Sequence, residues 1–252
     1  MSAPLGTEKT LRIVYTAIMT ALVTVVTMAF QIYIPATQGY FNLGESIVYL
    51  TALLFGPAIA AFAGGVGSMM ADIFTGYLHY APWTLVNKGI EGYLAGWFYL
   101  QLRKLSPSGW KKFNLAIIGV TVVGILYLGI TYFTGLAEIG GSPPFNWFFT
   151  ATFPVWIWIL VAVVFLIIAV YLGFFEDVMT GSAILSLLIA GVWMVFGDFV
   201  YEQFVLGYGA LAEVPFNIMQ VLSGIVIAIP LSKLVKMRLG ELFAEEDFFG
   251  EV

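Results

Sequence analysis

The 252-residue sequence has no cysteine and only one histidine, His79. Without thiols the chain cannot form disulfides, use a catalytic cysteine or bind a metal through thiolates. A single histidine also excludes an HEXXH-type zinc site and a bis-histidine haem. The sequence therefore predicts no metal site and no cofactor.

Charged residues are scarce as well, at 10% of the chain, whereas soluble domains carry about 25%. Hydrophobic residues make up 61% of the chain, and the mean hydropathy is +0.97. Most of the surface must then face the lipid bilayer, and no segment is left for a separate soluble domain. The basic residues are too few for nucleic-acid binding.

Apolar runs of roughly 20 residues, enough to cross a ~30 Å hydrocarbon core, recur along the chain. The predicted fold is therefore an all-α polytopic membrane protein with about eight spans. The predicted helices are 11–34, 45–56, 57–75, 83–102, 114–136, 150–174, 180–205 and 214–236. Gly56-Pro57 joins a short helix pair, and the polar stretch Pro35–Glu45 can dip inward if protein buries it. The first run lacks a signal-peptide cleavage site, so we expect a retained span.

Lysine and arginine predict the orientation. With eight spans, nine of these residues fall on one face, which must be cytoplasmic together with both termini. They are Lys9, Arg12, Arg103, Lys104, Lys111, Lys112, Lys233, Lys236 and Arg238. The acidic stretch 239–252 is expected to be a solvated cytoplasmic tail.

Polar residues inside the spans are functional candidates, because ionisable groups in a bilayer are costly. The candidates are Asp72, Lys88, Glu91, Asp198, Glu202, Asn217 and Gln220. In the predicted topology all of them lie in the outer half of the bilayer, above a dry inner half. A channel or an ion-coupled carrier needs polar groups near the midplane or along a full path. The pattern instead favours a receptor with a cavity open to the outside.

Spacing suggests how these residues pair. Lys88 and Glu91 are three residues apart and can neutralise each other, in a binding site or in a purely structural bridge. Asp198 and Glu202 also share a helix face, where they repel unless one is protonated or a donor lies between them.

Asn217 and Gln220 can read the hydrogen-bonding edge of a flat polar ligand, or they can join helices. Aromatic residues at the same level can stack on a ligand or mark the membrane interface. These are Tyr40, Phe41, Trp83 and Tyr201. His79 is expected to be a solvated loop residue. Ala17 and Ala21 form a small-xxx-small ridge that lets another helix approach closely, within the fold or from a partner.

Three stretches resemble the S components of energy-coupling factor (ECF) vitamin transporters, in the riboflavin-type branch. The first runs from Phe41-Asn42-Leu43-Gly44-Glu45 through Leu54-Phe55-Gly56-Pro57 to Ala71-Asp72. The second is Asn87-Lys88-Gly89-Ile90-Glu91-Gly92, and the third is Pro215-Phe216-Asn217-Ile218-Met219-Gln220, with Gly224 and Pro230-Leu231. The resemblance covers roughly three quarters of the chain.

The resemblance implies a six-helix receptor, not an enzyme, in a prokaryotic plasma membrane. It would capture a vitamin at the outer face and deliver it through a T component and two ATP-binding subunits. Ala17 and Ala21 would contact the T component, and the loop Pro35–Gly44 would close over the ligand. The core helices would be about 11–102 and 180–236, with 114–174 as an inserted helical hairpin whose connector is Glu138–Trp147.

Together, the residues and the resemblance predict a substrate-binding set. It comprises Asn42, Asp72, Trp83, Asn87, Lys88, Glu91, Tyr201, Glu202, Asn217 and Gln220. Four acids against one lysine favour a cationic solute or a neutral one with many hydrogen bonds. The family branch alone suggests riboflavin.

Two alternatives remain open at this point. One is a stand-alone secondary transporter coupled to protonation of Asp198 and Glu202. The other is an intramembrane enzyme with an acid pair among Asp72, Asp198 and Glu91, although no nucleophile–base set accompanies these acids. The chain has no Walker motif, so ATP hydrolysis would belong to a partner.

Overall fold

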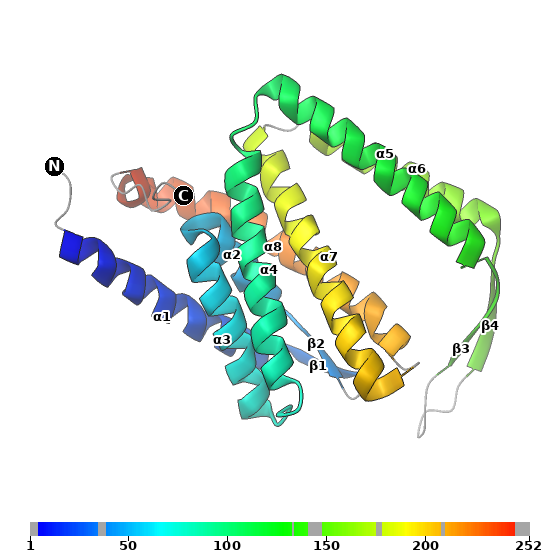
Figure 1. Ribbon diagram of the computed structural model, residues 1–252, viewed down its shortest axis with the longest axis horizontal. Coiled ribbons are helices and arrows are strands. Elements are labelled where there is room, and N and C mark those ends of the chain that lie inside the picture. Colours follow the sequence, from blue (N-terminus) through cyan, green and yellow to red (C-terminus); the bar gives the residue numbers. More distant parts are fainter. Residues whose placement is uncertain are drawn as a thin grey trace. The chain divides into compact units, whose positions relative to one another are not determined.

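The structure is a computed structural model that describes residues 5–34, 39–132, 134–140, 148–174, 178–207 and 210–244. It divides into two compact units, Met1–Leu102 with Ser182–Val252, and Arg103–Gly181. We refer to them as the first and the second unit. Figure 1 shows their helices and strands.

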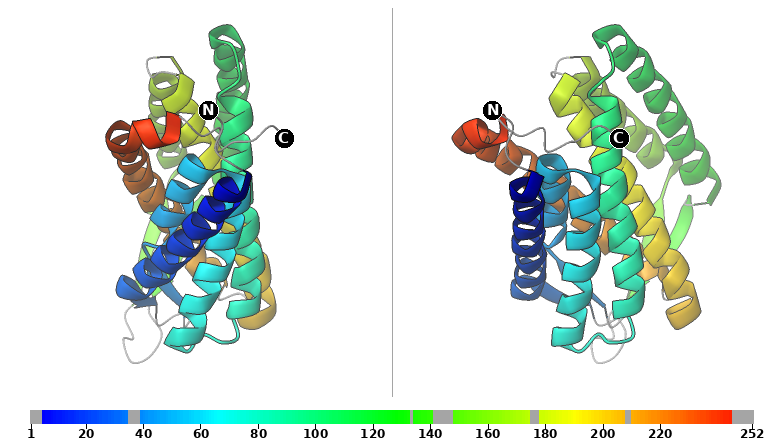
Figure 2. Two further views of the ribbon diagram at one scale, coloured as in Figure 1. Left: turned by 90° about the vertical axis from the view of Figure 1, so that its left-hand side faces the viewer. Right: turned by 60° about the vertical axis from the view of Figure 1, so that its left-hand side comes forward.

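The first unit contains most of the chain. Its elements are α1 (Leu5–Ala29), β1 (Gln31–Ile34), β2 (Gly39–Asn42), α2 (Glu45–Phe55), α3 (Pro57–Thr75), α4 (Ala81–Leu102), α7 (Val178–Leu206) from Ser182 onward, and α8 (Ala210–Ala244). Helix α3 packs along both α1 and α4, and Figure 2 shows these three helices side by side.

Helix α2 lies at the centre of the first unit. All of its residues are buried, and it contacts α1, α3, α4 and α8. Its 11 residues rise only about 16 Å, which is too short to cross a bilayer alone. The helix ends at Gly56, whose φ of 79° is unfavourable for other residues, and Pro57 starts α3. The break between the two predicted helices therefore lies at Gly56-Pro57, as the sequence predicted.

The second unit is a helical hairpin. Helices α5 (Pro107–Tyr132) and α6 (Val155–Phe174) lie side by side and are joined through strands β3 (Gly135–Gly140) and β4 (Phe148–Phe153) (Figure 1). Of the predicted connector, residues 141–147 lie outside the described residues.

The chain is predominantly helical, as predicted, but two antiparallel hairpins correct the all-α expectation. The first predicted helix was too long, because Gln31–Ile34 forms β1 and pairs with β2 from Gln31↔Asn42 to Ile34↔Gly39. Ile34 precedes Pro35, which disfavours helical geometry, and β-branched and aromatic residues favour a strand.

The same correction applies to the second unit. Residues 135–140 and 148–153, assigned in part to helices 114–136 and 150–174, are strands, and α6 begins only after Pro154. At the other end of the chain, α8 continues to Ala244 into the predicted acidic tail, of which 245–252 lie outside the described residues.

Five described helices are long and apolar enough to cross a membrane. They are Lys9–Ala29, Pro57–Thr75, Pro107–Thr131, Val178–Val205 and Glu213–Arg238. This agrees with a polytopic membrane protein, while the count of eight spans and the placement of the termini stay predictions.

Close approach of α3 and α4 provides a test of the packing. A Cβ on Gly96 would lie 2.6 Å from the backbone nitrogen of Pro57, so we expect Gly96→Ala to destabilise the protein by about 1–3 kcal/mol. Gly89 on the same helix is the matched control, because its nearest neighbour, the Ala61 carbonyl oxygen, is at 3.5 Å. Thermal unfolding in detergent should show a lower midpoint for Gly96→Ala only. Equal midpoints would contradict this packing.

Candidate functional site

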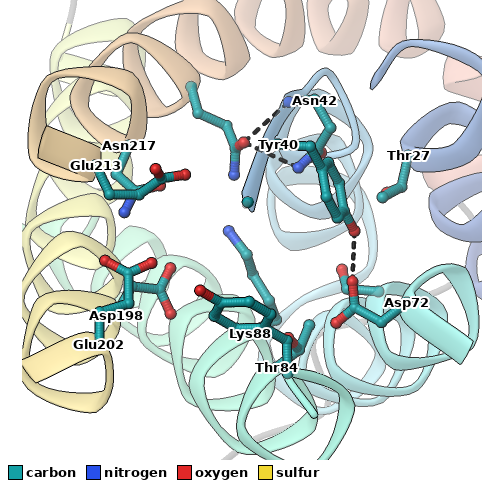
Figure 3. Close-up of a pocket in the computed structure, with 14 residues that line it drawn as sticks. Thr27, Tyr40, Asn42, Asp72, Thr84, Lys88, Asp198, Glu202, Glu213 and Asn217 are labelled. Carbon is teal, nitrogen blue, oxygen red and sulfur yellow. Dashed lines mark hydrogen bonds between the residues drawn. The ribbon is translucent and has the colours of Figure 1, made fainter. Parts of the chain in front are cut away.

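A polar cavity opens at one end of the first unit (Figure 3). It is lined by the C-terminal parts of α1, α3 and α7, by the N-terminal parts of α4 and α8, and by β2. Its volume is about 70 Å³, well below the about 300–1,000 Å³ that is typical of small-molecule sites.

Lys88 forms the floor of this cavity together with two buried carboxylates. Its Nζ contacts Glu45 Oε2 on α2 and lies 3.2 Å from Glu91 Oε2. Gln220 Nε2 donates to Glu45 Oε2 at 3.1 Å, and the Tyr49 hydroxyl donates to Glu91 Oε1 at 2.8 Å. Because buried charges are stable only when paired and hydrogen-bonded, these five residues act as one group, called here the floor network.

The floor network extends to the strand that borders the cavity. Gln220 Oε1 accepts hydrogen bonds from the backbone nitrogen of Asn42 at 3.1 Å and from its Nδ2 at 2.9 Å. Asn42 Oδ1 in turn accepts from the backbone nitrogen of Gly44 at 2.9 Å, just before α2 begins. The segment between α1 and α2 is thereby tied to α8.

A second contact holds β2 to α3. The Tyr40 hydroxyl donates to Asp72 Oδ1 at 2.5 Å, and the Tyr40 ring packs against Tyr77 with centroids 4.6 Å apart. Burial, with the nearby Asp72 carboxylate, raises the pKa of the Tyr40 hydroxyl far above its usual value. Tyr40 therefore stays protonated and remains a donor.

Asp198 is supported by neutral donors. Its Oδ1 accepts from Trp83 Nε1 at 3.1 Å and from Asn87 Nδ2 at 2.6 Å. Trp83 and Tyr201 stack on each other, 5.4 Å apart and 4° from parallel, and the Tyr201 hydroxyl donates to the His79 carbonyl oxygen at 2.6 Å. Their rings are thus occupied by each other, whereas the sequence suggested that they stack on a ligand.

Several buried polar atoms of the cavity lining have no hydrogen-bond partner among the described residues. They are Thr27 Oγ1, Asp72 Oδ2, Tyr80 OH, Glu202 Oε2 and Asn217 Nδ2. An unsatisfied buried polar group costs about 1–3 kcal/mol. Five such atoms therefore surround one hollow, where buried polar groups usually have partners.

The structure brings the predicted set together in two layers. Six of its members line the cavity: Asn42, Asp72, Lys88, Glu202, Asn217 and Gln220. The other four contact residues of the lining or one another: Trp83, Asn87, Glu91 and Tyr201. The predicted Lys88–Glu91 ion pair is present.

Sequence reasoning missed some lining residues and one essential partner. Glu45 was assigned only to the start of a helix, although a buried lysine needs more counter-charge than Glu91 can share with it. Glu213 lies four residues before Asn217 on α8, on the same helix face, and this spacing was a usable signal. Tyr40 was considered only for stacking. Within the described residues, no three histidine or acidic side chains form a group that could hold a metal ion.

A groove runs along α1 and α3 on a different surface of the first unit. Its lining includes Ala17 and Ala21 together with Thr24 and Phe62, and it is almost entirely apolar. The predicted small-xxx-small ridge therefore forms one wall of an open groove.

Comparison with known proteins points to one family. Residues 7–173 match the family model described as ECF-type riboflavin transporter, S component. The chain is 42% identical over 114 residues to "Uncharacterized protein in gap 3'region" of Pyrococcus woesei, covering 44% of this chain and 71% of that protein. It is 32% identical over 118 residues to "Thiamine precursor transporter HmpT" of Lactococcus lactis, covering 45% of this chain and 66% of that protein.

The matched segments thus span about two thirds of the length of these relatives. The family match includes α5 and most of α6, so it does not separate a family core from an inserted hairpin. The insertion of 114–174 stays a prediction.

The floor network can be tested through its cation. We expect Lys88→Met to destabilise the protein by about 3–5 kcal/mol, because Glu45 and Glu91 would be left buried without a counter-charge. Adding Glu91→Gln should restore part of the loss. Lys112→Met, at an exposed position, is the control. Thermal unfolding that is the same for Lys88→Met and Lys112→Met would contradict the assigned role.

Proposed function

This chain belongs to the ECF-type riboflavin transporter S component family, and we propose that it captures a small vitamin-type solute in the polar cavity. It is a transport protein and not an enzyme, and it is a multi-pass protein of the prokaryotic plasma membrane. The observation that carries the proposal is the open polar cavity, whose lining holds five buried polar atoms without a hydrogen-bond partner among the described residues.

Capture would take place from the outer side of the membrane. Lys9 and Arg12 lie in the first turns of α1, and Lys233 lies far along α8, whereas the cavity uses the opposite ends of both helices. Because lysine and arginine collect on the cytoplasmic side, this distribution supports a cavity that faces outward.

Delivery would require partner subunits, a T component and two ATP-binding ECF subunits. The groove with Ala17 and Ala21 supports a helix-docking surface for the T component, because small residues let helix backbones approach closely in a membrane. The segment 35–44 would act as the closing loop. Its described part is held through Tyr40 and Asn42, and residues 35–38 lie outside the described residues.

The names of the similar proteins suggest two solutes. Riboflavin follows from the description of the family, and a thiamine precursor follows from the name of the L. lactis relative. Both are small, nitrogen-rich heterocycles with several hydrogen-bonding groups, which is compatible with a cavity lined mainly by polar side chains.

Reconstitution tests whether this chain only binds the solute and needs its partners for uptake. Purified protein in nanodiscs should bind a vitamin-type solute, and proteoliposomes should accumulate that solute only with the T component, both ATP-binding subunits and ATP. Accumulation by this chain alone, driven by a pH gradient, would instead establish the rival function of a proton-coupled carrier through Asp198 and Glu202.

The groove can be tested separately from the cavity. The double variant Ala17→Leu/Ala21→Leu should leave solute binding within about twofold of wild type and reduce coupled uptake by about tenfold or more, because the larger side chains fill the groove. Ala58→Leu is the matched control, since Ala58 is also exposed on a helix of the first unit. Full uptake by the double variant would exclude this groove as the docking surface.

A further inference from the structure

One wall of the cavity is acidic. Asp198 and Glu202 come from α7, and Glu213 comes from the start of α8. Figure 3 shows these three side chains on one side of the hollow, with Asp72 on the other side. Carboxylates four residues apart on a helix are neighbours, so Asp198 and Glu202 raise the negative potential at the same place.

The described lining offers no free cation to balance this wall. Lys88 is its only lysine or arginine, and both salt bridges in the described part of the chain already involve Lys88. Glu45 and Glu91 already pair with it. Lys88 therefore leaves no counter-charge for the carboxylates of the acidic wall when they are ionised.

Two buried polar atoms show what is missing at the acidic wall. Glu202 is 4% exposed, and its Oε2 accepts no hydrogen bond from the part of the chain that the structure describes. Asn217 is 7% exposed, and in that same part of the chain its Nδ2 finds no acceptor. Asp198 differs, because neutral donors from Trp83 and Asn87 already support it. The wall thus lacks a donor for Glu202 and an acceptor for Asn217.

Taking the receptor function as given, we propose that the captured solute is a small organic cation. Its positively charged N–H groups lie against Glu202 and the neighbouring carboxylates, and an acceptor atom on the same molecule meets Asn217 Nδ2. Charge-assisted hydrogen bonds of this kind are stronger than neutral ones and allow tight capture by a small site.

A neutral flavin satisfies this wall less well. Riboflavin carries no charge near neutral pH, and its hydrogen-bond donors, the ring N3–H and the ribityl hydroxyl groups, are neutral. These donors can bond to a carboxylate, but they cannot offset its charge, so the acidic wall would keep its uncompensated charge. The proposal therefore selects against riboflavin within the family to which the chain belongs.

Matched probes test the charge requirement. Pyridoxamine and pyridoxine have nearly the same shape and differ by an ammonium group in place of a hydroxyl group. Calorimetric titration of the protein in nanodiscs should show pyridoxamine binding about tenfold or more tightly than pyridoxine. Thiamine, a cation, should likewise bind more tightly than riboflavin.

A variant tests whether Glu202 causes the preference for the charged probe. Glu202→Gln removes the charge but keeps the size of the side chain, so the preference for pyridoxamine should fall by about tenfold while pyridoxine affinity stays within about twofold. Glu241→Gln makes the same change on α8, about 40 Å along the helix from Glu213. This control should retain the full preference.

Three results would overturn the charge requirement: neutral probes binding as tightly as charged ones, neither pyridoxamine nor thiamine binding, or selectivity that survives in Glu202→Gln. Its failure is distinguishable from failure of the receptor function. Tight riboflavin binding with uptake that depends on the ATP-driven subunits would reject only the charge requirement. Charge-selective binding with uptake that needs no partner would reject only the proposed function.

Discussion

The cavity depends on a lysine that is buried between two carboxylates. Lys88 on α4 reaches Glu45 on α2 and Glu91 on its own helix. Gln220 donates to the same Glu45 oxygen that Lys88 contacts, and Tyr49 donates to the other oxygen of Glu91. Burying three charges is costly, and apolar side chains would fill the same volume more cheaply. We therefore regard the network as a specificity device: it fixes which ends of α2, α4 and α8 meet, and so where the cavity forms.

That network is protected by close helix packing. A Cβ on Gly65 of α3 would lie 2.6 Å from the Leu85 carbonyl oxygen, so these two helices touch through their backbones beside the lysine. The short α2 is buried on every side and delivers Glu45 at its first residue. A longer, straight helix would place this acid nearer the membrane surface. Water is thus kept from the ion pairs, which strengthens them.

Local sequence patterns predicted the helices and some of the contacts in the site. Apolar runs located every described helix, and the spacing of Lys88 and Glu91 predicted their pairing. The contact between Lys88 and Glu45 spans 43 residues, and periodicity carries no information about such pairs. The strands were missed because their apolar, β-branched residues continue the hydrophobic run of a span. Likewise, the Trp83–Tyr201 stack depends on how α4 meets α7, which composition does not encode.

The buried polar groups away from the cavity explain why a solute would not pass through the first unit. Thr51 on α2 donates to the Ile47 carbonyl oxygen at 2.6 Å, and Ser186 on α7 donates to that of Ala183 at 2.8 Å. Such hydroxyls are satisfied within their own helices and offer a solute nothing. Because the described core around them is apolar, a polar molecule leaving the cavity inward would lose every hydrogen bond it had made. Under the proposed function, the protein would therefore have to move around its cargo, which is consistent with the proposed role of ATP-binding partners.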